Sequence, residues 1–379
     1  MVLLAGSCLV ATACAPAPQV AHAGRTAAAR SSEGDPGPAA SSPEHEPSAS
    51  APEANRSAVL PAGRFAAGSS VPEASETPAV AEAGVEAPEV GPDAASLAWW
   101  RKARFGMFIH WGLYSILAGE WGGKTDYGEW IRESARIPRE RYHRLLKRFR
   151  PRKFNAKRWV RVARDAGMKY IVITTKHHDG FALFDSDTGE FDLGATPEKR
   201  DLLGELASAT RNAGLRIGFY HSIMDWDHPD YLPKRPWEQR DASQARFGRY
   251  YQYMKGQLRE LLTRYGDISI LWFDGQWDDT WSHAYGKDLY AFVRGLQPRI
   301  LINNRVDIGR RPDGLTEKGD YRGDFGTPEQ AIPQAAETTQ PWETCTTIGR
   351  HWGYNRRETK RKSVAKLLQI LADTSSKGG

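Results

Sequence analysis

Side chains capable of chemistry follow five short apolar runs of this sequence. They are His110, His177, His178, Asp179, Tyr220, His221, Trp272, Asp274, Asn303, Asn304 and Arg305. Aromatic rings stack on the apolar faces of sugars, while His, Arg and Asn side chains donate hydrogen bonds to hydroxyl groups. Cleavage of a glycosidic bond needs two carboxyl groups: one attacks the anomeric carbon or activates water, and the other protonates the leaving oxygen. Asp274, flanked by Trp272 and Trp277, is the first candidate, and a structural carboxylate that caps the next turn is the alternative.

A metal site is the competing chemistry. The residues that could supply nitrogen and oxygen ligands are His110, His177, His178 and Asp274. Neighbouring residues of a strand point to opposite faces, so His177 and His178 would share one metal only where the strand breaks. The H-x-H pair that barrel metallohydrolases commonly use is missing from these strand ends. A metal-dependent hydrolase stays as the alternative, and no cofactor or metal is predicted.

The elements that must hold these groups alternate between strand and helix. Strands are expected at 105–112, 170–177, 216–221, 268–274 and 299–305. Apolar residues at helical spacing predict helices at 159–166, 202–209, 247–265 and 289–296, and Gly167 is a plausible helix stop. Such repeats favour a parallel barrel or a doubly wound sheet, and no glycine-rich nucleotide fingerprint follows the first strand. Polar groups at all five strand ends favour the (β/α)8 TIM-like barrel, where these ends converge on one face.

The 379-residue chain divides in two by composition. Residues 1–95 hold four basic and eleven acidic residues, and Phe65 is the one aromatic residue among them. Residues 96–379 hold 48 basic and 35 acidic residues and every other aromatic residue. Only this second part can bury a core, so we expect one α/β catalytic domain over 96–379.

Residues 1–95 predict an export signal followed by a flexible linker. Residues 1–14 are apolar with small residues at their end, as in a secretory leader, and Cys14 lies where a bacterial lipoprotein is lipidated. No basic residue precedes Arg25, although leaders usually begin with one. Residues 15–95 are rich in Ala, Pro and Ser and are expected to form a disordered linker. The protein is therefore predicted to be periplasmic or extracellular, with a membrane tether if Cys14 is lipidated.

Other classes of protein find little support. No apolar stretch reaches the roughly 18 residues that a transmembrane helix needs. Three cysteines cannot build a disulfide framework, and their spacing is not that of a zinc site. The net charge of +6 could suggest nucleic acid, but basic and acidic residues are interleaved after residue 96 and no recognition motif is present. No nucleic-acid partner is predicted.

Six sequence blocks carry a family resemblance from about residue 99 to the end. They are FGMFIHWG (105–112), KHHDGF (176–181), GFYHS (218–222), LWFDG (271–275), NNR (303–305) and WETC (342–345), which WGY (352–354) follows. In this combination and order the chain resembles the retaining α-L-fucosidases of glycoside hydrolase family 29. The resemblance implies an exo-acting enzyme that removes terminal α-L-fucose from fucosylated oligosaccharides or glycoconjugates.

The resemblance also implies roles for matched residues. Asp274 would be the nucleophile that forms a covalent fucosyl–enzyme. The fucose pocket would be lined by His110, Glu129, Trp130, His177, His178, Tyr220, Trp272 and Arg305. Glu329 best matches the family's acid/base loop, Glu343 is the alternative, and Glu337 is a more distant one.

The end of the chain departs from the family pattern. After an expected helix over 364–371, the sequence shows neither the apolar NLLLN-type strand nor the C-terminal β-sandwich of family members. We therefore expect a barrel that is incomplete at its last strand, with two unpaired edges. An inactive or sugar-binding truncated barrel is the alternative function.

Overall fold

The computed structural model describes residues 2–4, 91–334 and 340–379. The strands are β1 Val2–Leu4, β2 Gly106–Ile109, β3 Tyr170–Lys176, β4 Arg216–Ser222, β5 Ile270–Asp274, β6 Leu301–Ile302 and β7 Cys345–Thr346. The longer helices are α1 Ala94–Ala103, α5 Ala156–Asp165, α6 Leu202–Asn212, α7 Phe247–Arg264, α8 His283–Leu296 and α9 Val364–Ser376. The short helices are α2 Tyr114–Leu117, α3 Ile131–Ser134, α4 Arg139–His143, η1 Leu146–Arg148 and η2 Asn304–Val306.

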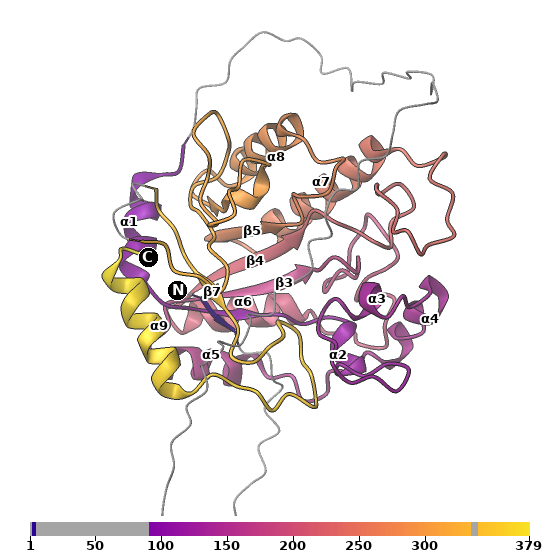
Figure 1. The fold of residues 1–379 in the computed structure, drawn as a ribbon, viewed down its shortest axis with the longest axis horizontal. Helices are drawn as coiled ribbons and strands as arrows, with labels where there is room; N and C mark the ends of the chain where they lie inside the picture. The colour runs from indigo at the N-terminus through magenta and orange to yellow at the C-terminus, as the bar shows by residue number, and fades with distance from the viewer. Residues whose placement is uncertain (1, 5–90, 335–339) are drawn as a thin grey trace, which may run out of the picture. The chain divides into compact units, whose positions relative to one another are not determined.

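The strands form one parallel sheet in the order β6-β5-β4-β3-β2-β1-β7. Isolated parallel bridges continue it beyond β6, pairing Asn303 with Phe325, Gly326 with Trp342, and Glu329 with Cys345. The segment 325–329 therefore lies between β6 and β7 and closes the sheet. Helices α5 and α6 flank the strands on one side, and α7 and α8 on the other (Figure 1). The predicted (β/α)8-type barrel is confirmed.

Local sequence explains where the helices begin and end. Asn155 and Asp201 accept hydrogen bonds from backbone N–H groups of the first turns of α5 and α6, which are otherwise unpaired. Helix α5 ends just before Gly167, which takes the positive φ of 83° that glycine tolerates best. The predicted helices at 159–166 and 202–209 thus lie at α5 and α6.

Alternate strand residues fill the inside of the barrel. Its buried cluster contains Trp100, Ala103, Phe108, Tyr170, Val172, Tyr220, Ile270, Trp272, Leu301, Phe325 and Cys345. Side chains two apart on a strand share a face, so Asp274 follows Trp272 on the inner face and reaches the end of the barrel where β5 stops. A larger cluster lies between sheet and helices. Because every second residue of β5 points into the barrel, Asp274 lies on its inner face at the mouth of the barrel.

The expectation of an incomplete last strand with two unpaired edges is corrected by the position of β1. Val2 pairs with Gly106 of β2 and with Cys345 of β7, so the backbone of β1 lies between these two strands. An extended segment is accepted there because strand edges offer rows of unpaired N–H and C=O groups. The run 299–305 also differs from expectation, since its strand is only Leu301–Ile302 and η2 follows.

Part of the N-terminal predictions lies outside the described residues. This holds for Cys14, for residues 5–14 of the expected leader and for residues 15–90 of the expected linker. Helix α1 begins at Ala94, two residues before the expected start of the domain at 96. Among the described residues, no helix combines the length and the hydropathy that a membrane span requires.

Candidate active site

Asp274 lies at the mouth of the barrel with both carboxylate oxygens engaged. Its Oδ1 lies 2.5 Å from Nη1 of Arg305, and its Oδ2 accepts a hydrogen bond of 2.9 Å from the hydroxyl of Tyr220. Nε2 of His178 lies 3.5 Å from the same Oδ2. The Asp274 side chain is 13% exposed, so it is held in place and still reachable from solvent. These contacts orient one carboxylate towards a site beside the imidazole of His178.

Arg305 joins Asp274 to Glu329. Nη2 of Arg305 lies 2.8 Å from Oε2 of Glu329, and its Nε donates to the hydroxyl of Thr327. The guanidinium also lies over the ring of Trp272, 4.7 Å from the centroid. Burial opposes its charge, but the carboxylates of Asp274 and Glu329 outweigh that effect and raise the pKa of Arg305. One buried cation therefore holds two carboxylates, one at each of its Nη nitrogens.

Three imidazoles lie close to these carboxylates. Strand β3 ends at Lys176, after a shift of register, so His177 and His178 are not alternating strand residues and their ring centroids lie 4.3 Å apart. His177 stacks on Tyr220, and His110 lies 5.5 Å from His177 between ring centroids. Because β3 ends at Lys176, the rings of His177 and His178 both lie beside His110 at this end of the barrel.

These rings are neutral hydrogen-bonding groups. Burial lowers the pKa of His110, His177 and His178 well below the usual range of imidazole. Within the part of the chain that the structure describes, Nδ1 of His110 and Nδ1 of His177 have no hydrogen-bond partner, whereas Nδ1 of His178 lies 2.6 Å from the hydroxyl of Ser222. Two buried ring nitrogens are thus enclosed by protein without a partner among the described residues.

The segment before α3 adds Glu129 and Trp130. The Glu129 carboxylate is buried, and its Oε2 accepts a hydrogen bond of 2.6 Å from the backbone N–H of Gly353. Burial raises the pKa of this carboxyl group. The Trp130 ring meets His178 edge to face at 5.1 Å and lies equally close to Trp226. Only Trp130 of this pair therefore contacts a histidine of the site directly.

The alternative acid/base residues lie elsewhere. Glu343 is 1% exposed and accepts hydrogen bonds from the indole of Trp272 and the hydroxyl of Tyr170, which begins β3 deep in the barrel. Glu337 lies outside the described residues. Of the three candidates, Glu329 is the carboxylate that shares a partner with Asp274.

Comparison with known proteins identifies the family of the chain. Residues 78–379 match the family model of α-L-fucosidases. The chain belongs to the α-L-fucosidase family. An α-L-fucosidase from Paenibacillus thiaminolyticus is 40% identical with a TM-score of 0.67, over 75% of this chain and 68% of that one. The enzyme from Lactobacillus casei in complex with α-L-fucose is 35% identical with a TM-score of 0.66, over 75% and 88% of the two chains.

Curated relatives of the family are longer. The tissue α-L-fucosidase of Bos taurus is 29% identical over 322 residues, which cover 77% of this chain and 64% of the bovine protein. The chain thus spans just under two thirds of the length of that relative.

Trp352 is a contributor that the sequence predictions missed. Its ring stacks on His110 at 5.4 Å, and its Nε1 donates to Oε1 of Glu329 at 3.2 Å. It lies in the WGY block that carries the family resemblance, and this was the available signal. Its position after β7 brings it to the same end of the barrel as Asp274. Trp277 also approaches His178, at 5.9 Å, and is 48% exposed.

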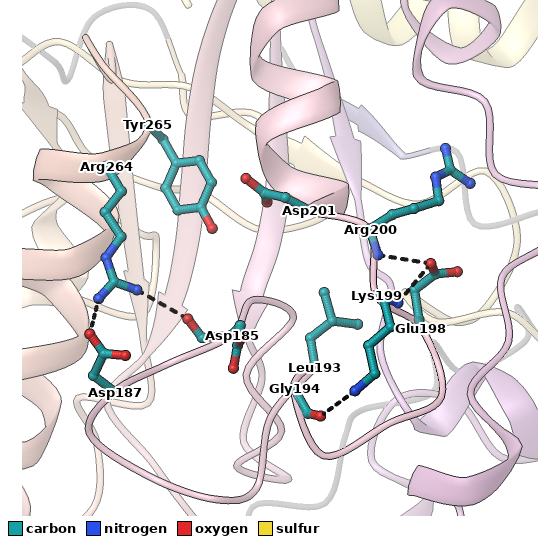
Figure 2. A pocket seen from close by; sticks show the side chains of 10 residues that line it. All are labelled: Asp185, Asp187, Leu193, Gly194, Glu198, Lys199, Arg200, Asp201, Arg264 and Tyr265. Carbon is teal, nitrogen blue, oxygen red and sulfur yellow. Dashed lines mark hydrogen bonds and ion pairs between the residues drawn. The ribbon is translucent and has the colours of Figure 1, made fainter.

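Two hollows in the described residues lie away from these family site residues. One, of about 350 Å³, is lined by charged residues that bond one another: Arg264 pairs with Asp187, and Lys199 donates to the carbonyl of Gly194 (Figure 2). The other, of about 380 Å³, lies around His143. Across the described ranges, no three His, Cys, Asp or Glu side chains are arranged to hold one metal ion.

Proposed function

We propose that this protein releases terminal α-L-fucose from fucosylated glycans by double displacement. Asp274 is the nucleophile and Glu329 the acid/base. The observation that carries the proposal is the guanidinium of Arg305, which lies 2.5 Å from Asp274 and 2.8 Å from Glu329. Retaining glycosidases need two carboxyl groups about 5–5.5 Å apart. Both carboxylates here bind the same guanidinium.

In the first step, an oxygen of Asp274 attacks the anomeric carbon while Glu329 protonates the leaving oxygen. The hydroxyl of Tyr220 and the guanidinium of Arg305 aim the attacking carboxylate. Burial raises the pKa of Tyr220 well above its usual range, and Asp274 raises it further, so its O–H stays a donor. Glu329 must carry a proton in this step, so its ion pair with Arg305 has to open as the leaving oxygen enters.

In the second step, water replaces the leaving group. Glu329, now ionised, removes a proton from that water, and the water oxygen attacks the anomeric carbon and breaks the ester to Asp274. The Glu329 side chain is 37% exposed, which suits a group that must meet solvent water. Asp274 leaves as a carboxylate, which Arg305 and Tyr220 stabilise.

The surrounding residues suit a small sugar. The imidazoles of His110 and His177 are neutral, and neutral imidazole both donates to and accepts from hydroxyl groups. The rings of Trp352 and Trp130 supply aromatic surface for the apolar faces of the sugar. Binding of fucose by a family member from Lactobacillus casei supports this choice of sugar.

Hydrolysis of 4-nitrophenyl α-L-fucoside tests the proposal. We expect activity in the unmodified protein that persists in a strong chelator, and a loss of at least about 100-fold in Asp274→Ala, equal to about 2.7 kcal/mol of barrier. Asp165→Ala is the control because Asp165 forms an exposed ion pair with Arg164. More than a few per cent of activity in Asp274→Ala would refute the nucleophile. Binding of L-fucose without turnover would favour the sugar-binding alternative, and loss of activity in chelator the metal-dependent one.

A further inference from the structure

Glu343 lies beneath the site rather than beside it. It is buried in the barrel, and its backbone N–H bonds the carbonyl of Gly326. Its Oε1 accepts the indole N–H of Trp272 at 2.9 Å, and its Oε2 accepts the hydroxyl of Tyr170 at 2.8 Å. Trp272 precedes Asp274 by one inward position, and Tyr170 is the first residue of β3. Both oxygens of Glu343 therefore face down the barrel, away from the mouth where Asp274 lies.

Trp272 connects Glu343 to the groups that hold the nucleophile. Its ring stacks on Tyr220, with centroids 5.8 Å apart and planes 18° apart. The Trp272 ring also contacts Arg305, whose guanidinium lies 4.7 Å from the ring centroid. Tyr220 and Arg305 each bond one oxygen of Asp274. A rotation of the Trp272 ring would therefore displace both partners of Asp274 at once.

The lower end of this chain of contacts is tightly packed. A side chain at Gly106 would bring its Cβ within 2.3 Å of the Tyr170 ring, so this ring fills the space above the strand and has little freedom. Burial raises the pKa of Tyr170 well above its usual range, and Glu343 adds to the effect, so the Tyr170 hydroxyl stays a donor. Tyr170 thus fixes the Glu343 carboxylate, which in turn fixes the indole of Trp272.

We propose that Glu343 is a positioning residue of the fucosidase reaction: it holds the Trp272 ring, and through it Tyr220 and Arg305, in the geometry that aims Asp274. The kinetic effects expected of Glu343 variants depend on the proposed function, because they are measured on fucoside hydrolysis. The proposal assigns the alternative acid/base candidate of the sequence a role distinct from proton transfer. The hydrogen bond between Glu343 and Trp272 exists whether or not the protein turns over a fucoside.

Two substitutions of Glu343 separate positioning from proton transfer. Glu343→Gln keeps an acceptor for the Trp272 N–H, and its amide can donate to the Tyr170 hydroxyl. Glu343→Leu removes both bonds and leaves the indole N–H unpaired. We expect Glu343→Gln to stay within a few-fold of the unmodified protein and Glu343→Leu to lose about 10-fold to 100-fold in kcat. The loss should be equal for 4-nitrophenyl α-L-fucoside and for a fucosyl disaccharide, with an unchanged pH profile.

An acid/base role would produce a different pattern. Both variants would then lose far more activity on the disaccharide than on the aryl fucoside, the alkaline limb of the pH profile would vanish, and added azide would yield fucosyl azide. That pattern would overturn the proposal. So would a Glu343→Leu variant with the kcat of the unmodified protein.

A spectroscopic measurement tests the contact without any substrate. The indole N–H resonance of Trp272, assigned by its disappearance in Trp272→Phe, should shift in Glu343→Leu and move much less in Tyr170→Phe. An unmoved resonance in a folded Glu343→Leu protein would overturn the inference. If Glu343→Leu does not fold, the double variant Glu343→Gln/Trp272→Phe is compared with Trp272→Phe alone. The two should have the same kcat, because Phe at 272 has no N–H group for residue 343 to accept from. Absence of fucoside hydrolysis in the unmodified protein would defeat the proposed function and leave the resonance test standing.

Discussion

Arg305 is the side chain on which the two proposed catalytic carboxylates converge. It is buried, it forms ion pairs with Asp274 and Glu329, and its Nε donates a hydrogen bond to the hydroxyl of Thr327. The planar donors of a guanidinium bind only where acceptors meet them, so Arg305 positions both carboxylates until its ion pair with Glu329 opens in the proposed first step. The separation of the two carboxylates is therefore set by one guanidinium. The division of labour between them follows from exposure, since Glu329 is the more accessible.

Glu329→Ala provides the residue-scale prediction. Hydrolysis of a fucosyl disaccharide should fall by about 10²–10⁴-fold, the usual contribution of general acid/base catalysis. The loss on 4-nitrophenyl α-L-fucoside should be smaller in the first step, because nitrophenolate leaves without a proton. Added azide should restore turnover of the aryl fucoside and yield fucosyl azide of the same anomeric configuration as the substrate. Product analysis by NMR checks both the rate and the configuration.

Glu343→Ala is the matched comparison for this experiment. It removes a carboxylate of the same length that lies inside the barrel. Azide rescue of Glu343→Ala without rescue of Glu329→Ala would reverse the assignment.

At the scale of elements, α3 ties together the loops that carry the site. The fully buried Arg132 of α3 donates to the carbonyl of Asp179 at 2.7 Å and pairs with Asp227 at 3.0 Å. Asp179 directly follows His178, and the backbone N–H of Trp226 bonds the carbonyl of His178. The loops after β3 and β4 therefore share a single buried cation. Breaking such a pair costs about 3–5 kcal/mol, so these loops move as one unit.

Asp179→Asn makes this cluster testable through pH. Burial raises the pKa of Asp179 to about 6, so the folded protein binds this proton more tightly than the unfolded chain does. The favourable contribution is complete below the ordinary pKa of 3.8 and is lost as the pH rises through 6. Asparagine does not titrate. As the pH rises from about 4.5 to 8, the free energy of unfolding of the variant should therefore rise by about 2 kcal/mol relative to that of the unmodified protein.

Urea unfolding at the two pH values measures this gain. Asp165→Asn, in an exposed ion pair with Arg164, is the control and should change stability little at either pH. An equal difference between Asp179→Asn and the unmodified protein at both pH values would show that Asp179 does not titrate as its burial predicts.

At the scale of the whole molecule, β1 joins the N-terminus to the barrel. Val2–Leu4 pair with β2 and β7. Arg104, which follows α1, donates to the carbonyl of Gly379, and β1 lies between β2 and β7. Val2–Leu4 also belong to the stretch that resembles an export leader. Cleavage of the predicted leader would therefore remove the residues that form β1.

Leu3→Pro distinguishes the two uses of this segment. Proline removes a backbone donor from a strand that is paired on both sides, so the chain that keeps its N-terminus should lose about 1–3 kcal/mol of stability. We propose that export removes the segment before Cys14, and in that processed form the substitution can have no effect. Urea unfolding of the unprocessed chain and the mass of the exported chain measure the two outcomes. Val364→Ser, at a 74% exposed position, is the control.

The fold class followed from local patterns. Runs such as 170–177 are apolar and β-branched, the helices between them keep helical spacing, and a polar group ends each run. Strand length was harder to predict at 299–305, where only Leu301–Ile302 pair before η2 turns the chain. Three apolar residues at the N-terminus carry no strand pattern, so β1 could not be predicted. Strand pairing over a long sequence separation depends on which edges are open, and no local pattern records that.

The sequence alone determined that the chain forms a parallel α/β barrel and that Asp274 stands at the end of an inward-facing strand. It determined this because the period of a strand and the direction of a barrel are properties of neighbouring residues. Only the tertiary structure shows that Glu329 and Glu343, which are the same residue type and lie close in sequence, meet different partners. The hydrogen bonds of Trp272 and Tyr170 take Glu343 into the barrel, and Arg305 holds Glu329 beside Asp274. Which partner a carboxylate finds depends on groups brought together from distant strands, and their meeting is a property of the closed barrel.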